Sequence, residues 1–177
     1  MRRIVWIFSI AAGLLIWHEA RPAEREGPRP TAYRITSRSV PSQYQRAYDF
    51  LEYIKWPADP KGEFKPNMAP KWDIPRFMSF VSKQGVVFSD VNGRLNGRAR
   101  PSEIENALAK RKGRVFVTFA HLSHIYSIPY QQYSELTFEA LPHGVVVHVS
   151  DWYKLTFVDD GGSLRLTRCD YIMLEGD

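Results

Sequence analysis

The alternation of apolar and polar residues after Gly113 constrains the fold of this chain most strongly. Val115, Val117 and Phe119 occupy alternate positions, and longer segments further on repeat the pattern. A period of two is typical of strands that bury one face. The strands expected on this basis span 115–119, 133–140, 145–158 and 163–174. Turn-forming residues at 141–144 and 159–162 resemble hairpin connections, so this part of the chain predicts an antiparallel sheet.

Helical periodicity precedes the sheet. In residues 42–55 the apolar positions recur at spacings of three and four, which predicts an amphipathic helix with Ser42 as its cap. A second helix is expected at 73–83 with Asp73 as its cap. Two further elements follow, a short buried strand at 86–88 and a third helix from Pro101. Helices followed by a run of strands predict an α+β fold, with the helices packed on one face of a curved sheet.

The N-terminus carries a targeting pattern. Arginines at positions 2 and 3 precede an uncharged, mostly apolar run at 4–17. As a helix this run would be about 21 Å long, short of a hydrocarbon core of about 30 Å, and this length is typical of a signal peptide. Cleavage after Ala20 would leave His18 where a small residue is preferred, so an uncleaved anchor stays open. We expect residues 1–20 to direct export to the periplasm or beyond, or to anchor the domain outside the inner membrane.

Two proline-rich segments flank the first predicted helix. Residues 21–41 lack apolar periodicity and are expected to form a flexible leader, which leaves 42–177 as one domain. The second segment, 56–75, combines five prolines with Trp56, Phe64 and Trp72. It is either an insertion that wraps the surface or a recognition element, because long loops in compact domains are often functional.

Charge and cysteine content exclude several classes of function. The net charge is +5, but residues 31–177 carry only 19 basic against 16 acidic side chains. No clustered basic face is evident, so we expect no nucleic-acid partner, and membrane contact only through the N-terminal segment. Cys169 is the one cysteine and lies in a strand pattern, where a buried, unreactive thiol is expected. No metal or phosphate-binding motif is present, and no cofactor is expected.

Residues 86–108, VVFSDVNGRLNGRARPSEIENAL, carry a resemblance to a known family. A strand, an Asp, a Gly-rich hairpin and a helix in this order resemble the nuclear transport factor two-like superfamily, which includes SnoaL-like cyclases and ketosteroid isomerases. The resemblance covers residues 42–174 in element order. It implies a cone-shaped fold, with three N-terminal helices on a curved antiparallel sheet of four to six strands.

The same resemblance implies a site. Asp90 matches the general base of the isomerase-like members, where a desolvated carboxylate moves a proton next to a carbonyl group. Tyr48 or Tyr53 could match their oxyanion donor. Tyr153 stands where those enzymes have a second acid, and Asp151 lies two residues earlier. The residues expected to line the pocket are His148, Tyr53, Phe88, Trp152 and Tyr153.

Structural roles compete with several of these assignments. Asp90 could cap the backbone at a strand end, and Tyr48 could belong to the core. His148 could line a pocket, a dimer surface or the free surface. His121 and His124, three residues apart on a strand or its end, would point to opposite faces and make a poor metal pair.

Two functions therefore remain open. The first is a non-catalytic binding or assembly module that forms a homodimer through its sheet, and the sequence slightly favours it. The second is a small-molecule pocket, either a simple binder of an apolar ligand or an isomerase, cyclase or dehydratase with Asp90 as general base. Asp90 pointing into a pocket would favour the second function, and an exposed apolar patch on the sheet would favour the first.

Overall fold

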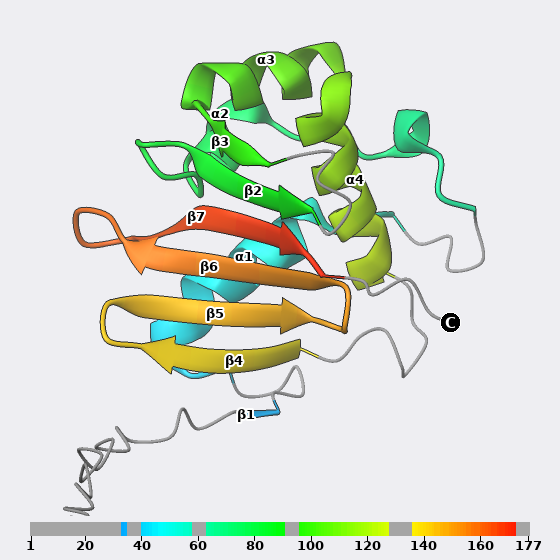
Figure 1. The fold of residues 1–177 in the computed structure, drawn as a ribbon. Coiled ribbons are helices and arrows are strands. Elements are labelled where there is room, and N and C mark those ends of the chain that lie inside the picture. Colours follow the sequence, from blue (N-terminus) through cyan, green and yellow to red (C-terminus); the bar gives the residue numbers. More distant parts are fainter. Residues whose placement is uncertain (1–32, 35–39, 58–62, 91–95, 128–135, 173–177) are drawn as a thin grey trace, which may run out of the picture.

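The computed structural model describes residues 33–34, 40–57, 63–90, 96–127 and 136–172 (Figure 1). The fold is α+β, as predicted. Its sheet joins, in this order, β1 (Tyr33–Arg34), β4 (Leu136–Leu141), β5 (Gly144–Val149), β6 (Tyr153–Asp159), β7 (Leu164–Tyr171), β2 (Val86–Asp90) and β3 (Gly97–Ala99). Helix α1 (Gln45–Ile54) crosses one face of that sheet. No helix among the described residues is both long enough and apolar enough to cross a membrane.

The first two predicted helices are present but differ in detail. A 3₁₀ turn, η1 (Ser42–Tyr44), leads into α1 (Gln45–Ile54), and Ser42 does not cap it, because it lies inside that turn. After η2 (Pro66–Met68), helix α2 (Ile74–Met78) is shorter than expected. Asp73 caps α2 as predicted, with its Oδ1 accepting a hydrogen bond of 2.7 Å from the Arg76 amide.

Two consecutive helices follow where one helix and one strand were expected. Helix α3 (Pro101–Lys110) begins at the predicted proline. The strand predicted at 115–119 is wrong, because these residues belong to α4 (Gly113–Ser127). The buried residues of α4 include Phe116, Phe119 and Ala120, at the spacing of one helix face, while Val117 is 39% exposed.

The single strand expected at 145–158 is in fact β5 and β6, separated by a turn in which Ser150 has a φ of 53°. The sheet is mixed, which corrects the expected antiparallel sheet. Strands β2 and β7 are parallel, with Asp90 in register with Tyr171.

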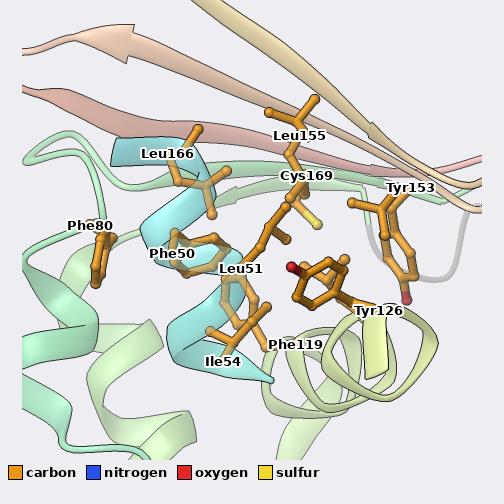
Figure 2. Close-up of a cluster of buried hydrophobic side chains, with 14 of the residues drawn as sticks. Phe50, Leu51, Ile54, Phe80, Phe119, Tyr126, Tyr153, Leu155, Leu166 and Cys169 are labelled. Carbon is orange, nitrogen blue, oxygen red and sulfur yellow. The ribbon is translucent and has the colours of Figure 1, made fainter. Parts of the chain in front are cut away.

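The core lies between the sheet and the helices. Alternate residues of β5 and β6 face it, namely Val145, Val147, Val149, Tyr153, Leu155 and Phe157. Figure 2 shows Phe50 and Leu51 of α1 pointing toward Leu155 and Leu166 of the sheet. Cys169 is buried beside them, as predicted, and burial raises the pKa of its thiol well above the ordinary value, so the reactive thiolate does not form.

The described part of segment 56–75 packs onto the domain. Arg111, in the left-handed conformation between α3 and α4, donates hydrogen bonds to the carbonyl oxygens of Asn67, Ala69 and Pro70 at 2.6 to 3.0 Å. The indole Nε1 of Trp72 donates to the Ile54 carbonyl at 3.2 Å. These bonds hold the loop against the end of α1 and the connection between α3 and α4, and Phe64 of the same segment lines the site described next.

Candidate functional site

A pocket of about 200 Å³ lies at the end of the sheet beside α4. Its described lining residues are Phe64, Phe88, Ser89, Asp90, Val117, Thr118, His121, Tyr153 and Tyr171. The strand pairing explains how three of them meet. Asp90 is in register with Tyr171 on β7, and Tyr171 is in register with Tyr153 on β6. The parallel pairing of β2 with β7 therefore places a carboxylate and two phenols in one row across three strands.

Helix α4 adds His121 to this row. Its Nδ1 lies 2.7 Å from the Tyr153 hydroxyl oxygen, a hydrogen bond whose donor depends on the imidazole tautomer. The imidazole ring lies 4.9 Å from the Phe64 ring and 5.6 to 5.7 Å from the rings of Trp152, Tyr153 and Tyr171. Surrounding rings and the Tyr153 hydrogen bond restrict its orientation.

Burial determines the protonation states at the site. It lowers the pKa of His121 to about 4, with a smaller contribution from the nearby His124, so the imidazole is neutral near pH 7. Burial also raises the pKa of Tyr153 and, together with the Asp90 carboxylate, that of Tyr171. Both phenols therefore keep their protons. The pocket offers two hydroxyl groups, a neutral imidazole and a carboxylate.

The structure brings together only some of the residues predicted for the site. Asp90, Phe88 and Tyr153 line the pocket, and Trp152 contacts the His121 ring at its edge. The other predicted residues, described next, lie elsewhere.

Tyr48 and Tyr53 are on α1, away from the pocket lining. Tyr48 lies beside Glu52 and Tyr126, and the Tyr53 hydroxyl donates to the Asp73 carbonyl at 2.8 Å. His148 lies on the opposite face of the sheet from the core, with its Nε2 3.7 Å from the Glu139 carboxylate. The structure therefore does not place these side chains with Asp90.

The sequence reasoning missed Tyr171, Phe64, Thr118, Val117, Ser89 and His121 as pocket residues. His121 was found in the sequence but assigned to a strand. With helical spacing, His121 follows Val117 by four residues and Thr118 by three, which places all three on one side of α4. That periodicity could have identified the helical wall of the pocket.

The two histidines of α4 lie on one side of the helix, so the expectation of opposite faces is wrong. Both contact the Phe64 ring, at 4.9 Å for His121 and 5.6 Å for His124. The described residues contain no group of three or more His, Cys, Asp or Glu side chains placed to hold a metal ion.

Comparisons of this chain with protein-family models, with curated proteins and with solved structures found no match. The pocket chemistry is therefore the feature from which a function can be inferred. Its central elements are the Asp90–Tyr171–Tyr153 row and the neutral His121.

The depressed pKa of His121 predicts a pH dependence of stability. The folded-state pKa is about 4, against an ordinary value of 6.5, so the folded protein binds this proton less readily than the unfolded chain. The stabilisation is complete above pH 6.5 and is lost as the pH falls toward 4. We expect the free energy of unfolding of the wild type, measured in urea, to fall between about pH 7 and pH 4.5. This fall should be roughly 2 kcal/mol larger than that of His121→Gln.

His143→Gln is the control, because His143 is exposed in the β4–β5 turn. We expect this variant to follow the wild-type pH profile. If the free energy of unfolding falls equally with pH in wild type and His121→Gln, this would contradict the burial of a neutral imidazole.

Proposed function

We propose that the domain binds a small organic molecule in the pocket at the ends of β2, β6 and β7. The observation that carries this proposal is the convergence of Asp90, His121, Tyr153 and Tyr171 on one space of about 200 Å³. An apolar hollow with a few convergent polar groups is typical of a ligand site.

The distribution of apolar surface supports a pocket more than a docking module. Among the described residues, the exposed large apolar side chains are Met68 at 57% and Val117 at 39%, and neither lies on the sheet. The outer face of the sheet instead carries polar residues such as Glu139, His148 and Arg168. An apolar patch for docking through the sheet is absent from the described strands, although a homodimer through this polar face is compatible with the proposal.

We propose further that the domain belongs to the nuclear transport factor two-like superfamily. The element order supports this assignment, since α1 and α2 precede the β2–β3 hairpin and α3 follows it. The parallel pairing of β7 with β2 departs from the antiparallel sheet that the resemblance implies. Export or anchoring through residues 1–20 is part of the same proposal and is supported by their sequence pattern.

Acid–base catalysis is the second candidate function. Asp90 and Tyr153 both line the pocket, and the Tyr153 hydroxyl is hydrogen-bonded to the neutral His121 imidazole. A carboxylate can take a proton from a carbon next to a carbonyl group, and a buried phenol can donate a hydrogen bond to the carbonyl oxygen. Tyr48, the predicted donor, lies beside Glu52 and Tyr126, away from Asp90. Tyr171 and Tyr153 lie in one row with Asp90, so they replace Tyr48 as the candidate donors in this chemistry.

Blocking the pocket mouth tests the proposed function. Val117 lines the pocket and is partly exposed, so Val117→Trp should place a large ring at its entrance. We expect a ligand-observed NMR screen of small fragments against the full chain to yield binders, whose affinity falls at least about tenfold in this variant. Glu105→Trp, on the exposed side of α3, is the control that should leave binding unchanged. Binders unaffected by Val117→Trp, or an absence of binders, would contradict the proposal.

A further inference from the structure

Among the described residues, the wall of the pocket has one sign of charge. Its described lining residues include one carboxylate, that of Asp90, and no lysine or arginine. His121 adds no positive charge near pH 7, because burial keeps it neutral. Burial raises the pKa of Tyr171 and of Tyr153, and the negative charge of Asp90 adds to this rise at both phenols.

Aromatic rings form much of the remaining wall. Phe64, Phe88, Tyr153 and Tyr171 surround the space on the side of the loop and on the side of the sheet. The faces of such rings are negative and attract cations, most strongly where water is excluded. A carboxylate together with several aromatic rings is a combination that favours positive charge and disfavours carboxylates and phosphates.

We infer that the ligand of this pocket is a small organic cation, an ammonium group with a few carbon substituents. This inference rests on the proposed function, since it requires that the pocket bind a small molecule. It adds the chemical class: Asp90 pairs with the ammonium charge, while Phe64 and Tyr171 contact its alkyl groups. The Tyr153 hydroxyl, fixed by His121, is placed to hydrogen-bond a polar substituent of the same ligand.

The size of the pocket sets the size of the cation. A pocket of about 200 Å³ is smaller than the roughly 300–1,000 Å³ typical of sites for drug-sized ligands, so it suits a cation of only a few non-hydrogen atoms. Choline has this size, and two analogues of nearly the same shape differ from it in charge. Dimethylbutanol replaces the ammonium nitrogen by carbon and is uncharged, and dimethylbutyrate is an anion.

Calorimetric titration of the full chain with these three probes near pH 7 tests the inference. We expect choline to bind at least about tenfold more tightly than dimethylbutanol, and dimethylbutyrate to bind more weakly than either. In Asp90→Asn the preference for choline over the alcohol should disappear. Asp49→Asn is the matched control, because Asp49 is an exposed carboxylate on α1 outside this pocket, and it should keep the wild-type preference.

The outcomes separate this inference from the proposed function. If dimethylbutanol binds as tightly as choline and Val117→Trp blocks both, the pocket binds small molecules but does not select cations, and the inference is overturned. If choline binds equally well to wild type and Val117→Trp, its site lies elsewhere and the inference is overturned as well. A choline preference that Asp90→Asn removes and Asp49→Asn retains supports it.

Discussion

Replacing Phe119 by alanine is expected to lower the free energy of unfolding by about 3–5 kcal/mol. Phe119 is fully buried on α4, and its ring lies 5.0 Å from that of Phe77, 5.5 Å from that of Phe88 and 6.4 Å from that of Phe50. It therefore joins α4 to α1, α2 and β2. Alanine would leave a cavity among rings that are themselves held by several elements and cannot collapse to fill it.

Val117→Ala is the informative partner of this variant. In the helix Val117 is 39% exposed, so its replacement should change stability by less than about 1 kcal/mol in urea unfolding. In a strand, Val117 and Phe119 would share one buried face, and Val117→Ala would then cost roughly 2 kcal/mol. A large loss for Val117→Ala would therefore contradict the helical assignment of 113–127.

Gly85→Ala is expected to destabilise the domain by roughly 3 kcal/mol or more. Gly85 has a φ of +85°, a conformation that costs a non-glycine residue about 1–2 kcal/mol. In addition, an added Cβ would lie 2.1 Å from the carbonyl oxygen of Ala99 on β3. Because that oxygen belongs to the backbone, the β2–β3 hairpin would have to open, and β2 carries Asp90 into the pocket.

Gly113→Ala separates the two causes. Gly113 has the same φ of +85°, but a Cβ there meets nothing within 4 Å. We expect its replacement to cost only the conformational strain of about 1–2 kcal/mol. Thermal or urea unfolding of the two variants side by side gives the difference, and equal losses would show that the approach of Ala99 to Gly85 does not matter for stability.

Local patterns were sufficient for much of the fold. The apolar spacing in 42–55 predicted α1, and Asp73 predicted the start of α2. Alternation predicted which residues of β5 and β6 face the core, such as Val147 and Leu155. These features are predictable because capping, turn formation and side-chain periodicity depend on residues close together in the chain.

The α4 segment shows where local patterns fail. Val115, Val117 and Phe119 satisfy a period of two, and valine is common in strands. The helix is favoured instead by contacts with distant partners, since it buries Phe116 against Trp72 and Phe119 against Phe77. Tertiary packing thus overrode local preference, and with it the placement of His121.

For the site, the sequence by itself determined which side chains stand at the strand ends. It predicted Asp90 and Phe88 on β2 and Tyr153 on β6 as pocket residues, and all three line the pocket. Only the tertiary structure decided that His121 and Tyr171 join them and that Tyr48 and His148 do not. The reason is that the row depends on the parallel pairing of β2 with β7, strands separated by more than seventy residues of sequence. No local turn or periodicity specifies that pairing, because the two strands lie far apart in the sequence and come together only through tertiary packing.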